Sequence, residues 1–274
     1  MITKKYSILL WFFTVIFTLG IAVYQRATGP TYPKKVETKL GNQTYKFKLL
    51  TTFSGELDAP VSLKVPADVK GEVKYRHYRS QEDWQSLAMK YNGESLKAFL
   101  PNQPPAGKLE YIVTLQYEGK NYTLNEDPVV IRYKGTVPLI ILIPHVILMF
   151  SAMLFSTRTG IEALGKGQRT FKYATVTLIT LGIGGMILGP IVQLYAFGDL
   201  WTGWPFGGDW TDNKTLFAFV FWVIAFFVLR KNRSNRLWPI IAFVALLAIY
   251  LIPHSMGGSE LDYETGKVTT GLKE

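Results

Sequence analysis

Five long apolar segments divide the chain, at residues 6–24, 137–156, 173–197, 216–229 and 237–252. The first comprises 19 residues, which is enough for a helix to cross the roughly 30 Å hydrocarbon core of a bilayer. The last two would be only about 21 and 24 Å long as helices, so we expect their polar flanks to enter the headgroup layer. The hydrophobic pattern therefore predicts five transmembrane helices.

The first apolar segment follows Lys4 and Lys5 and ends before Gln25 and Arg26. A cleaved signal peptide has a shorter apolar core and small residues at the cleavage site. Residues 23–26 (Val-Tyr-Gln-Arg) make a poor cleavage sequence. We therefore expect an uncleaved membrane anchor, with cleavage as the alternative.

Short runs of alternating apolar and polar residues fill the region between the first two apolar segments. Tyr45, Phe47 and Leu49, for example, are separated by Lys46 and Lys48. Gly and Pro residues interrupt these runs about every ten residues, as turns do between short strands. This period of two predicts an antiparallel β-sandwich.

One stretch of this region resembles a known domain type over residues 34–134. Leu-Pro at 100–101, Pro-Pro-Ala-Gly at 104–107 and Tyr-Ile-Val-Thr-Leu at 111–115 resemble the corner and the following strand of fibronectin type III and immunoglobulin-like domains. The resemblance implies that the Tyr111 hydroxyl bonds to the backbone. It also implies a module that binds or spaces rather than one that catalyses.

The fold class that we expect is an α+β membrane protein. Its extracytoplasmic antiparallel β-sandwich, immunoglobulin-like or fibronectin type III-like, is inserted between transmembrane helix 1 and a four-helix transmembrane bundle. The expected domains are an N-terminal anchor at 1–26, the sandwich at 27–135, the four-helix domain at 136–253 and an extracytoplasmic tail at 254–274. The four helices of the bundle are expected at residues 136–157, 173–197, 214–231 and 237–253.

Charge predicts the orientation of these helices. One side of the membrane collects ten basic residues against the single acid Glu162, and the other side's short loop and tail are acidic. The basic set is Lys4, Lys5, Arg158, Lys166, Arg169, Lys172, Arg230, Lys231, Arg233 and Arg236. The positive-inside rule then places the N-terminus in the cytoplasm, with five crossings, and the sandwich and C-terminus outside.

The net charge of +10 does not indicate a nucleic-acid partner, because the ten basic residues are expected to face anionic lipid. The chain contains no cysteine, which excludes disulfides, thiol catalysis and Cys-ligated metals. We also find no HExxH motif, phosphate loop or Ser-His-Asp order. No catalytic residue is predicted.

A loop at residues 197–214 carries three Trp, three Asp, four Gly and one Pro. This mixture of rings, carboxylates and turn residues is typical of a shaped binding surface for a cation, a polar substrate or a partner. The candidate surface comprises Trp201, Trp204, Asp209, Trp210, Asp212, Lys214, Glu260 and Asp262. The alternative is an aromatic belt at the membrane interface, with Thr211 or Asp212 capping the helix that enters at Lys214.

His145 lies in the second apolar segment after Pro144, and an ionisable group at that depth is a functional-site hypothesis by default. With His254 it could ligate haem b, and with Met149 and Met256 it could bind copper. The alternative is a neutral imidazole bonded to a neighbouring helix, with no cofactor bound. Gly185-x-x-x-Gly189 predicts close packing of helices.

The loop run at 201–214, together with Ile-Pro-His-Ser at 252–255 and Ser-Glu-Leu-Asp-Tyr at 259–263, resembles an uncharacterised family of bacterial envelope membrane proteins. That resemblance implies setting and topology only, and the setting is a bacterial cytoplasmic (inner) membrane. The favoured hypothesis is a non-enzymatic subunit, scaffold or assembly partner of a membrane complex, which contacts the lipid bilayer and other envelope proteins. The alternative is a redox or metal-handling membrane subunit that uses His145 and His254.

Charge also suggests how the favoured hypothesis would work. The predicted sandwich, at residues 26–134, carries 17 basic and 12 acidic residues, a net charge of +5. The outer loop and the tail carry three Lys against seven acids, a net charge of −4. Opposite signs favour docking of the sandwich on the loop and tail, and salt would weaken that attraction.

Overall fold

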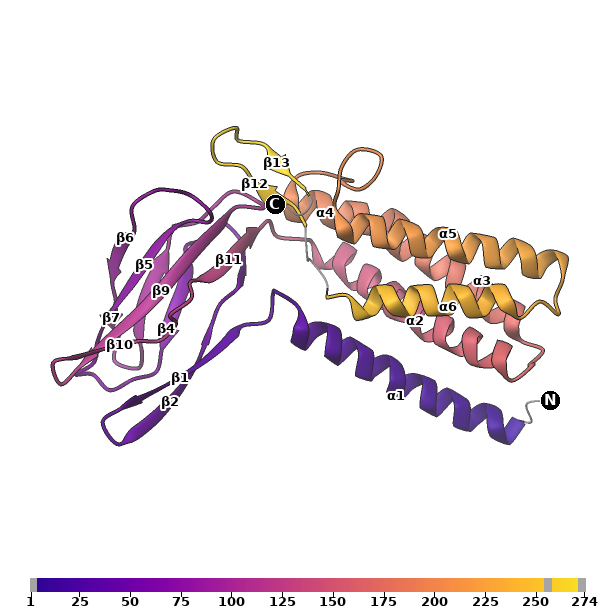
Figure 1. Cartoon of the computed structure of the whole chain (residues 1–274), viewed down its shortest axis with the longest axis horizontal. Helices are drawn as coiled ribbons and strands as arrows, with labels where there is room; N and C mark the ends of the chain where they lie inside the picture. Colours follow the sequence, from indigo (N-terminus) through magenta and orange to yellow (C-terminus); the bar gives the residue numbers. More distant parts are fainter. Residues whose placement is uncertain (1–3, 254–257, 271–274) are drawn as a thin grey trace. The chain divides into compact units, whose positions relative to one another are not determined.

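The computed structural model describes residues 4–253 and 258–270 (Figure 1). It is an α+β structure with two compact units, and we describe each by itself. The helical unit draws on residues 1–29, 137–259 and 270–274, and the β unit on residues 30–136 and 260–269. The expected tail at 254–274 is thus divided, because residues 260–269 belong to the β unit.

The helices of the helical unit follow the predicted apolar segments. Their bounds are α1 (Lys4–Thr28), α2 (Leu139–Leu164), α3 (Thr170–Leu181), the π-helix η1 (Gly182–Leu188), α4 (Gly189–Phe197), α5 (Trp210–Lys231) and α6 (Leu237–Leu251). Four helical stretches are long and apolar enough to cross a membrane, namely Lys5–Thr28, Leu139–Leu164, Thr170–Phe197 and Trp210–Lys231. Helix α6 is apolar but has only 15 residues.

Helix α2 continues beyond its predicted end at residue 157, and this corrects the role expected for Arg158. The side chain of Arg158 is fully buried and pairs with Glu162, one turn later, at an Nη1–Oε2 distance of 2.7 Å. Its guanidinium carbon lies 5.5 Å from the ring centre of Trp11 and 5.1 Å from that of Tyr173. Arg158 therefore packs inside the helical unit and does not face lipid headgroups.

Small residues allow the helices to pack closely. A Cβ atom on Gly184 would lie 3.3 Å from the backbone nitrogen of Met149 in α2, and one on Gly185 would lie 2.8 Å from Thr215 in α5. Alanines fill much of the remaining core around the buried Trp222. Close helix packing in the glycine-rich segment is confirmed.

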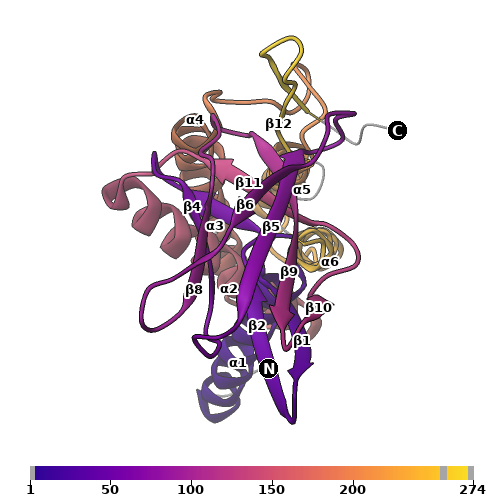
Figure 2. The same ribbon diagram turned by 90° about the vertical axis from the view of Figure 1, so that its left-hand side faces the viewer.

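Three sheets form the body of the β unit (Figure 2), and a fourth is the small β12–β13 pairing described below. Strands β1 (Lys34–Leu40) and β2 (Gln43–Leu49) form a two-stranded ribbon. A six-stranded sheet has the order β3-β11-β9-β5-β6, with β10 also on β9, and a three-stranded sheet has the order β4-β8-β7. The bounds are β3 (Thr52–Ser54), β4 (Ala59–Leu63), β5 (Lys70–His77), β6 (Gln85–Ala88), β7 (Lys90–Tyr91), β8 (Leu96–Leu100), β9 (Lys108–Tyr117), β10 (Lys120–Thr123) and β11 (Val129–Lys134).

Inward-facing residues of the ribbon and of both larger sheets share one hydrophobic core. Val73 of β5, Val113 of β9 and Leu100 of β8 are fully buried in it. Most strand pairs are antiparallel, but β11 pairs with β3 in parallel. The six-stranded sheet is therefore mixed, whereas the sequence pattern predicted only antiparallel pairing.

Tyr111 of β9 is a buried residue whose hydroxyl donates to the backbone carbonyl of Leu50, at 2.9 Å. Burial raises the pKa of this phenol far above its ordinary value. The acceptor lies between β2 and β3, 61 residues earlier in the chain. The expected bond from the Tyr111 hydroxyl to the backbone is therefore present. Its acceptor lies in a distant segment and not in the corner just before β9.

The last described segment forms a small hairpin of β12 (Glu260–Leu261) and β13 (Val268–Thr269). The backbone nitrogen of Leu261 donates to the carbonyl of Ala106 at 3.0 Å. We call residues 260–269 the C-terminal hairpin. It is a structured part of the β unit.

Candidate functional site

The Trp-rich loop, residues 198–209, ends at a helix cap. Asp209 Oδ1 accepts a hydrogen bond from the backbone nitrogen of Thr211 at 2.7 Å and from that of Asp212 at 3.4 Å. A carboxylate at this position satisfies helix N–H groups and interacts favourably with the helix dipole. Helix α5 therefore begins at Trp210, and the expected cap at Thr211 or Asp212 is wrong.

Side chains of the first turn of α5 hold the backbone of the loop. Asp212 Oδ2 accepts the backbone N–H of Thr202 at 2.7 Å, and Asn213 Oδ1 accepts that of Trp204 at 2.6 Å. A Cβ atom on the intervening Gly203 would lie only 2.6 Å from the Cβ of Asp212. The close approach of loop and helix therefore requires glycine at position 203.

The other polar side chains at this end of the helical unit also make internal bonds. Gln193 of α4 donates to the Thr202 hydroxyl at 2.5 Å, and the buried Lys214 donates to the carbonyl of Pro253 at 3.4 Å. Ser259 donates to Asp209 Oδ2 at 3.4 Å. The polar groups of the loop and of the start of α5 thus stabilise the conformation of the Trp-rich loop.

Three aromatic rings of the loop and of the start of α5 are exposed on the surface of the helical unit. Trp204 is 68% exposed and Phe206 is 83% exposed, and Trp210 is also exposed. Trp201 is partly buried and donates its indole N–H to the carbonyl of Trp204 at 3.1 Å. We call Trp204, Phe206 and Trp210 the exposed rings. The loop combines a bonded polar interior with an apolar outer surface.

Glu260 and Asp262 belong to the β unit, whereas the other predicted surface residues belong to the helical unit. Glu260 forms an ion pair with Lys108 of β9. Asp262 Oδ1 accepts the backbone N–H groups of Glu264 and Thr265, both at 3.0 Å. Both carboxylates therefore serve the C-terminal hairpin and its turn, and the eight predicted surface residues do not form a single site within either unit.

A polar cluster that the sequence did not predict fastens the C-terminal hairpin to the β unit. The ring centres of His77 and Tyr263 lie 4.0 Å apart. The Tyr263 hydroxyl accepts the backbone N–H of Lys108 at 2.9 Å and donates to Gln103 Oε1 at 3.0 Å. Burial is the largest effect on the Lys108 ammonium and lowers its pKa, although Glu260 opposes that shift.

This cluster makes the stability of the β unit depend on pH. Burial raises the pKa of Tyr263 to about 12 from an ordinary 10.0, so the folded protein keeps a proton that the unfolded chain loses. The contribution of Tyr263 to stability is therefore complete below pH 10 and falls as the pH rises towards 12. We expect the stability of the Tyr263→Phe variant to fall less steeply than that of the wild type as the pH rises across that window. Circular dichroism during alkaline titration measures this. Equal slopes would contradict the role of this phenol.

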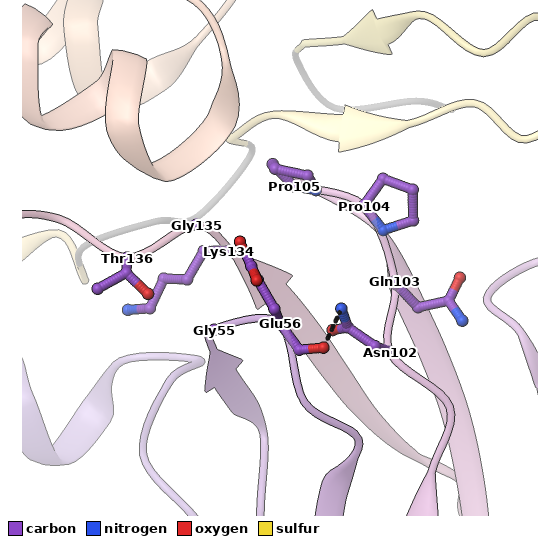
Figure 3. Close-up of a pocket in the computed structure, with 9 residues that line it drawn as sticks. All are labelled: Gly55, Glu56, Asn102, Gln103, Pro104, Pro105, Lys134, Gly135 and Thr136. Atoms are coloured by element: carbon purple, nitrogen blue, oxygen red, sulfur yellow. Dashed lines mark hydrogen bonds between the residues drawn. The ribbon is translucent and has the colours of Figure 1, made fainter.

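The β unit also contains a pocket of about 540 Å³ (Figure 3). Its lining residues are Gly55, Glu56, Asn102, Gln103, Pro104, Pro105, Lys134, Gly135 and Thr136. Asn102 donates through Nδ2 to the carbonyl of Glu56 at 3.1 Å, and its backbone nitrogen donates to Asp58 Oδ1 at 2.9 Å. These segments are far apart in sequence, so periodicity alone could not bring them together.

The imidazole of His145 bonds to a neighbouring helical segment. Its Nδ1 lies 2.8 Å from the carbonyl oxygen of Gly184 in η1. A carbonyl only accepts, so Nδ1 carries the proton and donates. His254 and Met256 lie outside the described residues. Within residues 4–253 and 258–270, no group of three or more His, Cys, Asp or Glu side chains is arranged to hold a metal.

Comparison with known proteins adds no relative. No family model matches the chain, and a search of curated proteins finds no match. The function must therefore be argued from the geometry described above.

Proposed function

We propose that this chain is an integral membrane protein with five transmembrane helices, and that the β unit, the Trp-rich loop and the C-terminal hairpin share one side of the membrane. Four helical stretches have the length and apolar composition to cross a bilayer. The fifth crossing would be made by α6. Its 15 residues extend about 22 Å, which requires its flanks to enter the headgroup layer.

The observation that carries this topology is the place of the C-terminal hairpin. The β unit follows α1 and precedes α2 in the chain. Three crossings, by α2, by α3 with η1 and α4, and by α5, would take the chain to the opposite side. Residues 260–269 nevertheless belong to the β unit, which supports a return crossing by α6.

The basic residues support the orientation. Arg236 Nη1 donates to the carbonyl of Gly167 at 2.9 Å and to the Thr170 hydroxyl at 2.7 Å. The loop between α2 and α3 and the loop between α5 and α6 therefore meet at one end of the helical unit. Both loops are basic, so the positive-inside rule favours the cytoplasm for this end. The β unit would then lie outside a bacterial cytoplasmic membrane.

The β unit supports a role in binding or spacing. Its sheets share a core, and its buried Tyr111 bonds to the backbone, although at Leu50 and not at the corner. Its sequence resembles immunoglobulin-like and fibronectin type III domains. Such modules usually present surfaces to other molecules. We infer that the β unit is an extracytoplasmic domain of this type.

The Trp-rich loop supports a non-enzymatic role, as a subunit, scaffold or assembly partner of a membrane complex. The carboxylate of Asp209 caps α5 and that of Asp212 holds the loop backbone, whereas the exposed rings lie on the surface. Aromatic side chains that are held rigidly and exposed are well suited to contact with a protein partner. The outer surface of the loop and of the start of α5 is therefore mainly aromatic, with the exposed carboxylate of Asp199 beside the rings.

Site-specific photo-crosslinking in cells tests this role. A photoreactive phenylalanine analogue at Phe206 should form discrete adducts with another membrane or envelope protein. The matched control is the same analogue at Phe99, an exposed phenylalanine of β8 in the β unit, which should not form those adducts. An absence of protein adducts at Phe206, or the same adducts at both positions, would count against a docking loop.

A second candidate is the redox or metal-handling subunit, and the imidazole of His145 favours it. Donation from Nδ1 to Gly184 orients the ring and leaves the Nε2 lone pair available, an arrangement that metal-ligating histidines use. An absorption spectrum and metal analysis of purified wild type and His145→Ala protein decide the matter. A haem band or stoichiometric copper that the variant loses would establish this function, and a colourless, metal-free protein would refute it.

A further inference from the structure

One face of the ribbon formed by β1 and β2 is strongly basic. Cross-strand register pairs Lys35 with Lys48, Glu37 with Lys46 and Lys39 with Thr44. All six of these residues are exposed. Strand alternation gives them one common face. We call this the basic face, and it carries four lysines and one glutamate.

The opposite face of the ribbon explains why the basic face points outward. Leu40, Phe47 and Leu49 occupy the alternate positions of the two strands and are buried in the core of the β unit. A slip of one residue in register would exchange the two faces and expose these three side chains. Burial of the apolar face therefore fixes the lysines on the outside.

The charges on the basic face are poorly compensated within the ribbon. Lys35 and Lys48 are direct cross-strand partners, and like charges in that position are destabilising. The one ion pair on the face joins Lys46 to Glu37 at 3.6 Å, with both side chains largely exposed, and such pairs contribute little. An anionic surface would relieve the repulsion between Lys35 and Lys48.

The chain connection keeps the basic face close to a membrane that α1 crosses. Helix α1 has 25 residues and is therefore about 37 Å long, longer than the roughly 30 Å hydrocarbon core. The linker at 29–33 has five residues, including Pro30 and Pro33, and can span at most about 18 Å. Lys35 and Lys48 lie at the end of the ribbon that this linker joins to α1.

We propose that the basic face docks on the anionic headgroups of the bilayer that α1 crosses. The inference rests on the proposed function, because it requires α1 to be inserted. Lysines are compact point charges that suit a diffuse layer of phosphate-bearing headgroups. The carboxylates of Asp209 and Asp212, which could have attracted the ribbon, already bond within the helical unit. Lipid is therefore the partner that the chain connection favours.

Each lysine near an anionic bilayer should favour the docked state about five-fold. Removal of the pair nearest the linker, in Lys35→Gln/Lys48→Gln, should therefore reduce the ratio of docked to undocked ribbon about 25-fold. Salt near 1 M should have a similar effect, because its screening length is only about 3 Å. Neither change should disturb the apolar face of the ribbon.

Fluorescence quenching in liposomes tests the proposal on the full chain. The chain lacks cysteine, so Thr44→Cys on the basic face can carry a single fluorophore. The probe is quenched by lipids labelled at the headgroup, in vesicles of phosphatidylcholine alone or of phosphatidylcholine with phosphatidylglycerol. The control variant is Lys64→Gln/Lys90→Gln, which removes two exposed lysines associated with the three-stranded sheet.

We expect stronger quenching in the phosphatidylglycerol vesicles, lost in high salt and in Lys35→Gln/Lys48→Gln, and retained in the control variant. Equal quenching in both lipids, or equal losses in both double variants, would overturn the proposal. Crosslinking of the ribbon to an acidic protein without any response to lipid would overturn it as well. Alkaline extraction of the same vesicles distinguishes the two failures, because a chain that is extracted refutes membrane insertion itself.

Discussion

Replacement of Glu162 by glutamine should lower the free energy of unfolding of the helical unit by about 3–5 kcal/mol. The side chains of Arg158 and Glu162 are 0% and 4% exposed, and their Nη1–Oε2 distance is 2.7 Å. Loss of the carboxylate charge would leave a guanidinium buried among Trp11 and Tyr173. A buried charge without its partner is among the largest destabilising effects known for a single substitution.

The substitution has a second cost at the start of α3. Glu162 Oε1 also accepts the backbone N–H of Arg169, the residue that precedes α3, at 3.2 Å. An amide oxygen accepts this bond less strongly than a carboxylate does. The Glu162 side chain thus joins the end of α2 to the beginning of α3.

Denaturant titration of detergent-purified protein measures this effect. Asp199→Asn, which removes an exposed carboxylate from the Trp-rich loop, is the matched control and should change stability by less than about 0.5 kcal/mol. The double variant Arg158→Met/Glu162→Gln should recover most of the loss, because it removes the stranded charge. If Glu162→Gln is no less stable than Asp199→Asn, the pair does not carry the stability that its burial implies.

Replacement of Asp212 by alanine should release the Trp-rich loop and destabilise the helical unit by about 1.5–3 kcal/mol. Asp212 is buried, and its carboxylate accepts the backbone N–H of Thr202 at 2.7 Å. Without it, that donor and the hydroxyl of Thr202 lose their charged acceptor. The exposed rings would then no longer be held in one arrangement.

Limited proteolysis measures the release of the loop. Chymotrypsin cleaves after aromatic residues but not before proline, so cleavage after Phe206 should become faster in Asp212→Ala than in wild type. Asp199→Asn should be cleaved at the wild-type rate, because its carboxylate is exposed in the same loop. Unchanged cleavage in Asp212→Ala would mean that other contacts suffice to hold the loop.

The apolar pattern predicted the helices well, because a run of apolar residues has few alternatives to a buried or lipid-facing helix. The ends of the helices were less accurate. Helix α2 extends past Arg158 because Trp11 and Tyr173 accommodate the charge, and those residues are distant in sequence. Helix α5 begins at Trp210 because Asp209 is its cap.

The candidate site was only partly predictable. The Trp-rich loop has a strong local signal, but composition does not reveal that Asp212 and Asn213 bind the loop backbone while Trp204 and Phe206 are exposed. Glu260 was grouped with the loop on charge, whereas its partner is Lys108, 152 residues earlier. Such a pairing depends on the tertiary fold, and periodicity carries no information about it.

The most direct test of the proposed topology is the accessibility of single cysteines, introduced into this cysteine-free chain, to a membrane-impermeant reagent. The positions are Asn42 in the turn of the β1–β2 ribbon, Lys267 in the C-terminal hairpin and Ser234 in the basic loop before α6, and all three residues are exposed. With five crossings, Asn42→Cys and Lys267→Cys should react in intact cells, and Ser234→Cys only after permeabilisation. Reaction of Lys267→Cys and Ser234→Cys from the same side would mean that α6 does not cross, and would contradict the account.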